Sequence, residues 1–306
     1  MKTRPLVLTA YLTVCLVWGS TYLAIRIGVQ NLPPFLFAGL RHLLAGMLLG
    51  AICLAAGQPF PRQWRSIRDQ ILIGLLLLVG GNGLVVWAEQ WVSSSVTALL
   101  LAMVPLFAAW LGILLCGGRL GLRPWLGLLI GLAGVALLVG PAAPRDDAWL
   151  TGALVVLLAA FSWALGSVYA QRRRGNGAIL PGIALQMLAG GFVLSLIGLG
   201  LGQAADPRLT SRGLSALLYL VLCGSLLGYT AYVYLLRNMP AAKASTYAYI
   251  NPVVAVILGA LILKEPITVR MLLALPLILG GVLLVQVAGG RKRKEAQVAA
   301  PADITR

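Results

Sequence analysis

Long runs of apolar residues, separated by short polar segments, make up most of the chain. A helix rises about 1.5 Å per residue, so about 20 residues cross the roughly 30 Å hydrocarbon layer of a membrane. The runs lack the two-residue alternation of a barrel strand, which leaves the helix as the spanning element. The pattern predicts ten spans, at residues 6–28, 34–56, 70–88, 94–116, 123–140, 148–171, 178–201, 213–236, 241–263 and 267–288.

The composition agrees with a lipid environment, because 60% of the residues are hydrophobic and only 10% are charged. Soluble domains carry about 25% charged residues, so the charges here are too few to cover a water-soluble globule. The net charge is +16, but the cations lie between apolar runs. We therefore expect the lipid bilayer, and not nucleic acid, as the partner of these cations. The four cysteines lie inside apolar runs without a C-x-x-C pair, which predicts buried packing residues.

Lys and Arg are concentrated on one side of the predicted topology. Seventeen of them lie in segments on the side of the N-terminus and five on the other side. Cytoplasmic loops attract Lys and Arg, so both termini are predicted in the cytoplasm. The segment 289–306 begins with a basic cluster, and we expect it to be a disordered tail on the inner leaflet.

The chain matches itself without a gap at a constant offset of 147 residues. The matched pairs include Gly19 with Gly166, Pro34 with Pro181, Pro105 with Pro252, and Gly134 with Gly281. Five spans per repeat is an odd number, so the second repeat enters the membrane from the opposite face. The prediction is an all-α integral membrane fold of two inverted five-helix repeats, 1–141 and 148–288. Such repeats are typical of secondary transporters, although duplication that merely builds a stable bundle is the alternative.

Several residues in the middle of spans interrupt a regular helix. Pro105 and Pro252 each remove a backbone hydrogen bond, so each predicts a helix kink beside a central cavity; the alternative is a packing kink. Asn251 adds a side-chain amide at the same depth. The run Gly80-Gly81-Asn82-Gly83 predicts a hinge in the third span.

Ionisable residues within or at the ends of spans are few. Arg41 lies about 10 Å inside the second span, and Glu89 and Arg26 end the third and first spans. A charge in this setting faces a partner or a water-filled cavity, so Arg41 and Glu89 indicate either a site for a charged ligand, a proton-coupling pair, or a latch between helices. His42, the one histidine, is more typical of helix packing.

Aromatic and amide side chains deep in the spans suggest a pocket, with pure packing as the alternative. Buried Trp and Tyr need partners for their N–H and O–H groups, and belt aromatics belong at the membrane interfaces. The candidate substrate-binding residues are Trp18, Tyr22, Arg41, Asn82, Glu89, Met103, Trp163, Gln186, Tyr232, Tyr247 and Asn251.

Catalytic and nucleotide-binding motifs are missing from the sequence. It contains no H-E-x-x-H and no G-x-x-x-x-G-K-[ST], and no aspartate lies in the interior of a span. A single histidine also limits catalytic triads. We therefore expect no enzyme activity, no cofactor and no metal.

Several short motifs, in order along residues 6–288, carry a family resemblance. They are Trp18-Gly19-Ser20-Thr21-Tyr22, Pro33-Pro34 through Ala38-Gly39-Leu40-Arg41, Ala88-Glu89, Ser94-Ser95-Val96-Thr97-Ala98 with Pro105, Ala244 through Asn251-Pro252, and Lys264-Glu265-Pro266. The sequence resembles the EamA-type members of the drug/metabolite transporter superfamily. The first repeat departs from the pattern, with Gly118 where a glutamate like Glu265 is expected.

The resemblance implies ten helices in a bacterial inner membrane and export of metabolites or drugs by alternating access. Similar exporters handle amino acids, including aromatic ones. The leading hypothesis is thus an exporter or facilitator of amino acids and related small molecules. The alternatives are a multidrug exporter of lipophilic cations and, in a different class, a non-transporting membrane scaffold or enzyme. A monomer is favoured.

Overall fold

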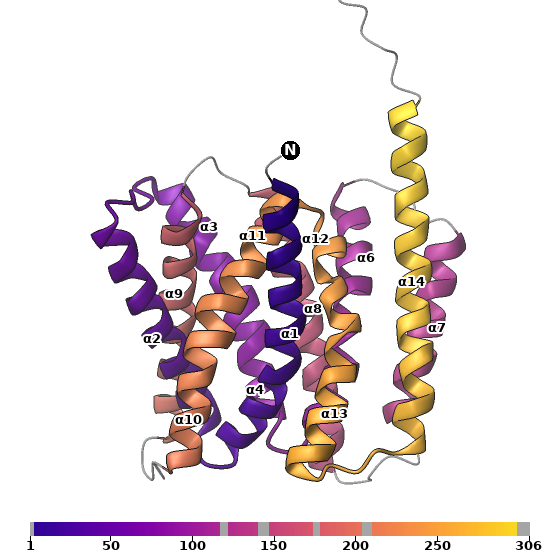
Figure 1. The fold of residues 1–306 in the computed structure, drawn as a ribbon, viewed down its shortest axis with the longest axis horizontal. Helices are drawn as coiled ribbons and strands as arrows, with labels where there is room; N and C mark the ends of the chain where they lie inside the picture. The colour runs from indigo at the N-terminus through magenta and orange to yellow at the C-terminus, as the bar shows by residue number, and fades with distance from the viewer. Residues whose placement is uncertain (1–2, 117–121, 140–146, 174–177, 204–209, 299–306) are drawn as a thin grey trace, which may run out of the picture.

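The computed structural model describes residues 3–116, 122–139, 147–173, 178–203 and 210–298, and its regular elements are all helices (Figure 1). Helices satisfy their backbone hydrogen bonds internally, as a lipid environment requires. Eight of them are long and apolar enough to cross a membrane, counted over the described residues. These eight match eight of the ten predicted spans. Two shorter apolar helical segments, Trp125–Leu137 and Val269–Gly281, lie where the fifth and tenth spans are predicted.

The first repeat runs from α1 to α7, and two of its candidate membrane spans are interrupted. Its elements are α1 (Thr3–Val29), α2 (Pro34–Ala55), α3 (Trp64–Gly74), η1 (Leu75–Gly83), α4 (Leu84–Ala88), α5 (Ser94–Leu101), α6 (Val104–Cys116) and α7 (Leu122–Val139). The second repeat follows the same plan. Its elements are α8 (Asp147–Arg172), α9 (Ile179–Gly200), α10 (Ser211–Tyr219), η2 (Leu220–Tyr229), α11 (Thr230–Asn238), α12 (Ala241–Ala244), η3 (Ser245–Tyr249), α13 (Asn251–Leu263) and α14 (Val269–Val298).

The interruptions fall at equivalent places in the two repeats. The segments η1 and η2 are π-helical, and the 147-residue offset superposes most of one on the other. The hinge predicted at Gly80–Gly83 lies within η1. The fourth span breaks between α5 and α6, just before Pro105, and its equivalent passes through the 3-10 segment η3 just before Pro252. π-Helical and 3-10 segments inside spans are common at functional sites.

Equivalent helices of the two repeats pack against each other at the two sides of the molecule. At one side α2 lies along α9, where a Cβ on Gly191 would be 2.6 Å from the main-chain nitrogen of Leu43. At the other side α7 lies along α14, where Gly281 approaches the main chain of Gly131 (Figure 1). Close backbone approach at glycine is typical of packing between membrane helices. Self-pairing of equivalent helices is the arrangement that a pseudo-two-fold axis produces.

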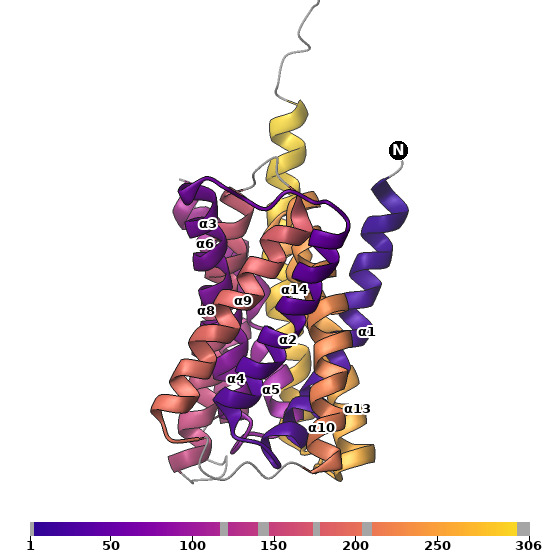
Figure 2. The same ribbon diagram turned by 90° about the vertical axis from the view of Figure 1, so that its left-hand side faces the viewer.

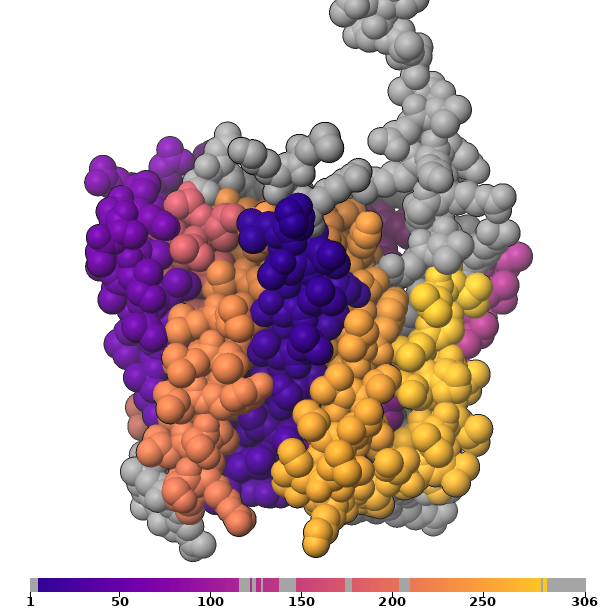
Figure 3. Space-filling view, in the orientation of Figure 1, coloured from indigo at the N-terminus to yellow at the C-terminus, as the bar shows by residue number. Residues whose placement is uncertain are grey.

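The remaining spans form two bundles, each of which mixes the repeats. In the first, which we call the α1 bundle, α1 packs against α10, η2, α11 and α13. In the second, the α8 bundle, α8 packs against α3, η1, α4, α5 and α6. Figure 3 shows α1 between the α10–α11 segment and α13 on one face of the molecule. Each bundle therefore takes one span from one repeat and two from the other.

The two repeats run in opposite directions. Arg26, at the end of α1, donates a hydrogen bond to the main-chain oxygen of Glu89, and Gly152, at the start of α8, packs against Val92 and Trp91. Thus α8 begins at the end of the molecule where α1 finishes. We call that end the far end, and the end where α1 begins, marked N in Figure 1, the near end.

The exterior is apolar along the helices, as a lipid-facing surface should be. On α1, the exposed fractions of Leu8 and Leu16 are 58% and 66%, and α13 exposes Leu261 by 75%. The structure differs from the sequence-based expectation at the C-terminus, since α14 continues as a helix to Val298 and projects beyond the bundle (Figure 2). Residues 291–298 contain no proline or glycine, and seven of the eight are Arg, Lys, Glu, Ala or Gln, which favour a helix. The rest of the predicted tail lies outside the described residues.

Candidate functional site

A cavity of about 60 Å³ lies between the two bundles and is closed on a third side by α2. Its wall includes residues of the two π-helical segments, η1 and η2, and of the helices α1 and α8. The α1 bundle supplies Trp18, Thr21, Tyr22, Ile25, Gly224 and Tyr229, and the adjoining η3 supplies Tyr247 and Ala248. The α8 bundle supplies Leu78, Gly81, Asn82, Val85, Leu101, Val104, Ala159 and Trp163, and α2 supplies Arg41 and His42. The cavity is therefore built from both repeats.

Four aromatic rings meet at the interface between the bundles. Trp18 of the α1 bundle lies edge-on to Trp163 of the α8 bundle, with ring centroids 5.3 Å apart. Tyr247 contacts Trp18 at 5.0 Å, and Tyr232 contacts both tryptophans, at 5.1 and 5.4 Å. Such edge-on pairs are favourable, at about 0.5–1.5 kcal/mol each beyond burial. The rings give the cavity an aromatic wall.

Trp18 and Tyr232 have protein partners for their polar groups, whereas the indole nitrogen of Trp163 has no hydrogen-bond partner among the described residues. Trp18 donates from Nε1 to the main-chain oxygen of Gly224 at 3.0 Å, an oxygen inside the π-helical segment η2. The Tyr232 hydroxyl lies 2.7 Å from the Ser167 hydroxyl of the other bundle and 3.2 Å from that of Ser245. These bonds fix the orientation of the Trp18 and Tyr232 rings.

A second part of the wall is polar and contains a cation. Arg41 is 3% exposed, donates from Nε to the Ser225 hydroxyl at 2.8 Å, and donates from Nη1 to Asn82 Oδ1 at 3.3 Å. His42 Nε2 lies 3.0 Å from the same Asn82 oxygen. Asn82 belongs to η1 and Ser225 to η2, so the guanidinium joins the two π-helical segments.

The structure brings together six of the eleven predicted substrate-binding residues. The six that line the cavity are Trp18, Tyr22, Arg41, Asn82, Trp163 and Tyr247. Tyr232 lies directly behind the two tryptophans. Gln186 is one layer further out, where Oε1 accepts from the Tyr229 hydroxyl at 2.6 Å. Tyr229 itself lines the cavity.

The other three predicted residues, Met103, Asn251 and Glu89, lie away from the cavity. Met103 is fully buried in the break between α5 and α6, and its sulfur lies near Gly131 of α7. Asn251 is fully buried; with its amide oriented to satisfy hydrogen bonding, its nitrogen donates to the main-chain oxygens of Cys15 and Tyr247, at 3.1 and 3.2 Å. The third, Glu89, lies at the far end.

Glu89 and Arg41, considered together as a ligand site or a latch, are separated in the structure. Glu89 is 0% exposed, and neither carboxylate oxygen has a hydrogen-bond partner among the described residues. Arg26 binds its main-chain oxygen and not its side chain. Arg41 instead faces the cavity, since its partners are Ser225 and Asn82.

The far end is closed by Glu265, which follows α13 and reaches across to the start of α5. Its carboxylate accepts from the main-chain nitrogens of Ser94 and Ser95, at 3.0 and 3.2 Å, and from both hydroxyls, at 2.9 and 2.6 Å. A carboxylate is favourable at a helix N-terminus because free N–H groups and the helix dipole face it. This contact joins the α1 bundle to the α8 bundle.

The near end is closed by a weaker set of contacts at the equivalent helix start. Ala241, 147 residues after Ser94, begins α12 and donates from its main-chain nitrogen to Gln171 Oε1 at 3.1 Å. Gln171 Nε2 also donates to the main-chain oxygen of Met239 at 3.3 Å. The sequence explains the difference, since Gly118 stands at the position equivalent to Glu265 and alanines replace the two serines.

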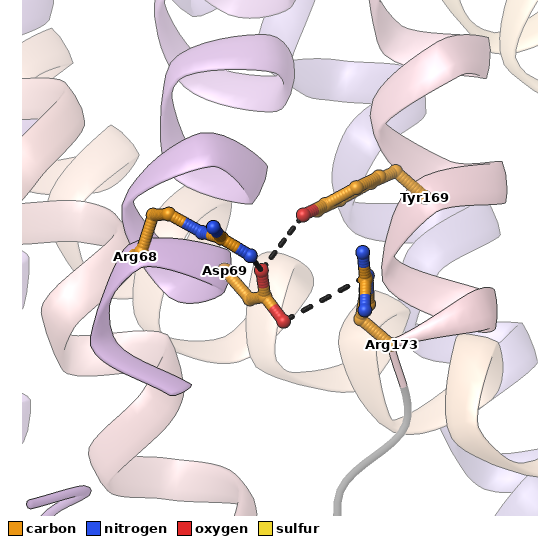
Figure 4. Close-up of polar contacts among 4 residues, drawn as sticks. All are labelled: Arg68, Asp69, Tyr169 and Arg173. Carbon is orange, nitrogen blue, oxygen red and sulfur yellow. Dashed lines mark hydrogen bonds and ion pairs between the residues drawn. The ribbon is translucent and has the colours of Figure 1, made fainter. Parts of the chain in front are cut away.

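A polar cluster ties α3 to α8 within the α8 bundle. Asp69 accepts from the Tyr169 hydroxyl at 2.8 Å and pairs with Arg68 at 3.3 Å and Arg173 at 3.8 Å (Figure 4). The guanidinium of Arg173 also lies 5.6 Å from the centroid of the Tyr169 ring. The cluster lies outside the cavity and holds one bundle together.

Sequence reasoning missed several residues of the cavity wall. Tyr229 is among them, although the 147-residue offset makes it the equivalent of Asn82, which was predicted. Gly224 and Gly81 are others; a Cβ on Gly81 would lie 2.6 Å from the Trp163 ring. Searching the repeat for equivalents of each candidate would have found Tyr229.

Both halves of the chain match one family model, described as the EamA-like transporter family, at residues 5–140 and 150–287. The chain is 42% identical to YedA of Escherichia coli K12, described as an uncharacterized inner membrane transporter, over 88% of this chain and 87% of YedA. It is 27% identical to a probable amino-acid metabolite efflux pump of the same organism, over 94% of this chain and 96% of the pump. One crystal structure has the same fold, with a TM-score of 0.67 at 21% identity, covering 92% of this chain and 98% of that one.

Proposed function

The chain belongs to the EamA-like transporter family, of the drug/metabolite transporter superfamily, and we propose that it exports or exchanges small metabolites, chiefly amino acids and among them aromatic ones. The family and the relatives point to a transporter and not to an enzyme. In this proposal the protein acts by alternating access, and the substrate occupies the central cavity.

The proposal includes ten spans and two cytoplasmic termini in a bacterial inner membrane. Trp125–Leu137 and Val269–Gly281 are taken as the fifth and tenth spans because α7 and α14 pack against each other as α2 and α9 do. The seventeen-to-five distribution of Lys and Arg supports a cytoplasmic near end. The far end then faces outward.

One observation carries the proposal: the cavity lies between two bundles that each combine both repeats. The cavity lies where a substrate would be reached from either end if the two bundles separated there. Polar contacts join the bundles at both ends, and in this proposal these contacts open alternately.

The nature of the wall favours amino acids over lipophilic cations. Trp18, Trp163 and Tyr247 offer flat rings for an aromatic or aliphatic side chain. The charged side chain in the wall is Arg41, which repels cations. The probable amino-acid metabolite efflux pump among the relatives is consistent with this substrate class.

A counterflow screen in proteoliposomes tests the proposal. Vesicles loaded with unlabelled L-tryptophan or L-phenylalanine are expected to accumulate the labelled amino acid. Trp163→Ala is expected to reduce that uptake about tenfold, because it removes a flat ring from the wall and aromatic contacts contribute about 0.5–1.5 kcal/mol each. Trp64→Ala, at a side chain 69% exposed, is the matched control. Uptake of lipophilic cations without uptake of any amino acid would reject the proposal in favour of a drug exporter.

A further inference from the structure

Arg41 is a buried cation without a buried counter-charge. Its side chain belongs to the cavity wall and is 3% exposed. Among the described residues no carboxylate lies within ion-pair distance of it, since the ion pairs found there all involve Asp69. A charge inside a membrane protein is costly and normally faces a partner of opposite charge or water. The missing partner is thus expected to come from the cavity.

The neighbours of Arg41 position its guanidinium and leave donors free. A guanidinium has five N–H donors, and the contacts with Ser225 and Asn82 use two of them. Both partners are neutral, so they orient the group without neutralising it. On the side of η2, a Cβ on Gly224 would lie 2.8 Å from Nη2, so glycine provides the space that the group occupies. The result is a fixed, planar donor at the cavity wall.

The charges of the wall define the ligand more closely. Arg41 is the one Arg or Lys of the wall, and no Asp or Glu belongs to it. One guanidinium neutralises one negative charge, and a guanidinium pairs with a carboxylate in a planar, two-bond geometry. A ligand ammonium group finds no carboxylate here and meets aromatic faces instead, an interaction of about 0.5–2 kcal/mol.

We propose that Arg41, oriented by Asn82 and Ser225, is the carboxylate-binding group of the cavity, and that the protein selects aromatic monocarboxylates whose amino group contributes little. The inference rests on the proposed function, because it assigns the substrate class of the same cavity. It extends that function to aromatic carboxylic acids that lack an amine.

Three indole compounds test the inference in a binding assay. L-Tryptophan carries both groups, indole-3-propionate lacks only the amine, and tryptamine lacks only the carboxylate. Thermal unfolding of the purified protein in detergent is expected to shift upward with tryptophan and with indole-3-propionate. Tryptamine is expected to bind at least about tenfold more weakly, as the loss of one charge-assisted contact predicts. Equal stabilisation by tryptamine and tryptophan would overturn the inference.

Variants at Arg41 complete the test. Arg41→Gln is expected to lose the preference for the two carboxylates, whereas Arg41→Lys keeps part of it and shows that the protein still folds. Arg65→Gln, which removes an exposed cation, is the matched control and should retain the full preference. If both Arg41 variants bind the three compounds as the wild type does, the inference is overturned.

The assay separates this inference from the proposed function. If the purified protein binds tryptophan and indole-3-propionate through Arg41 while proteoliposomes exchange neither, the carboxylate site stands and the transport proposal fails. If proteoliposomes exchange tryptophan and tryptamine at equal rates, transport stands and the carboxylate site is rejected.

Discussion

The Ser95 hydroxyl donates to the Glu265 carboxylate at 2.6 Å, and this contact joins the two bundles at the far end. At the equivalent helix start of the near end, the main-chain nitrogen of Ala241 donates to the neutral amide of Gln171. Hydrogen bonds to a charged group contribute about 1.5–3 kcal/mol each, against about 0.5–1.5 kcal/mol for neutral pairs. The far end is therefore the harder one to open, and we expect a resting population that opens toward the near end.

The first prediction concerns Glu265. Glu265→Gln keeps the shape but removes the charge, so opening of the far end should increase about tenfold or more, given 1.5–3 kcal/mol per lost charged contact. The measurement is the labelling rate of a cysteine introduced at Ala159, in the cavity wall, by an impermeant maleimide added to right-side-out vesicles.

Asp69→Asn is the control for Glu265→Gln, since Asp69 holds α3 to α8 within one bundle. It should leave the labelling rate unchanged. Equal increases in both variants would mean that loss of any hydrogen-bonded carboxylate loosens the protein, and the assignment of Glu265 to the far-end closure would be wrong.

The second prediction concerns the Asp69–Tyr169 pair. Tyr169→Phe removes one hydrogen bond to a charged group, so the free energy of unfolding should fall by about 1–2 kcal/mol. Because both residues share one contact, Tyr169→Phe and Asp69→Asn together should destabilise by less than the sum of the single effects. Thermal unfolding of the four proteins measures this coupling, and strictly additive effects would show that the contact carries no energy.

The third prediction compares two glycines in the middle of helices. A Cβ on Gly39 would lie 2.7 Å from the main-chain nitrogen of Ser195, so Gly39→Ala should separate α2 from α9 and lower the melting temperature. A Cβ on Gly112 meets nothing within 4 Å, so Gly112→Ala should be neutral or raise stability by up to about 1 kcal/mol. Similar melting temperatures for the two variants would contradict the observed packing.

The fourth prediction separates two residues that the sequence could not distinguish. Arg41→Gln should lower tryptophan counterflow at least about tenfold, as loss of a charge-assisted contact to substrate predicts. Glu89→Gln should leave counterflow at equal pH nearly unchanged, because Glu89 does not line the cavity and its carboxylate has no described partner. A larger loss of counterflow in Glu89→Gln than in Arg41→Gln would show that the charged group of the ligand binds at the far end and not at Arg41.

The sequence predicted the helical spans and the repeat well, because lipid requires long apolar runs and duplication leaves matched Pro and Gly positions. Depth along a span also located Trp18, Trp163 and Tyr247 correctly at the centre. Depth does not give direction around a helix, however, so Met103 was placed in the pocket although it faces α7.

The arrangement of the bundles could not be read from the repeat. A constant offset shows that the halves are equivalent, but not that α1 packs against α10, η2, α11 and α13 of the second repeat and α8 against elements of the first. The role of Glu265 was hidden for a similar reason, since its partners Ser94 and Ser95 lie about 170 residues away, and only the folded chain brings them within hydrogen-bond distance.

The most direct test of alternating access locks the far end with a disulfide. A Cβ on Gly259 of α13 would lie 2.8 Å from the Ser95 hydroxyl of α5, within reach of a disulfide. The measurement is tryptophan counterflow by Ser95→Cys/Gly259→Cys, with the four native cysteines replaced by alanine, under oxidising and reducing conditions. The account predicts that oxidation stops counterflow, that reduction restores it, and that neither single variant responds. Undiminished counterflow by the fully cross-linked protein would contradict it.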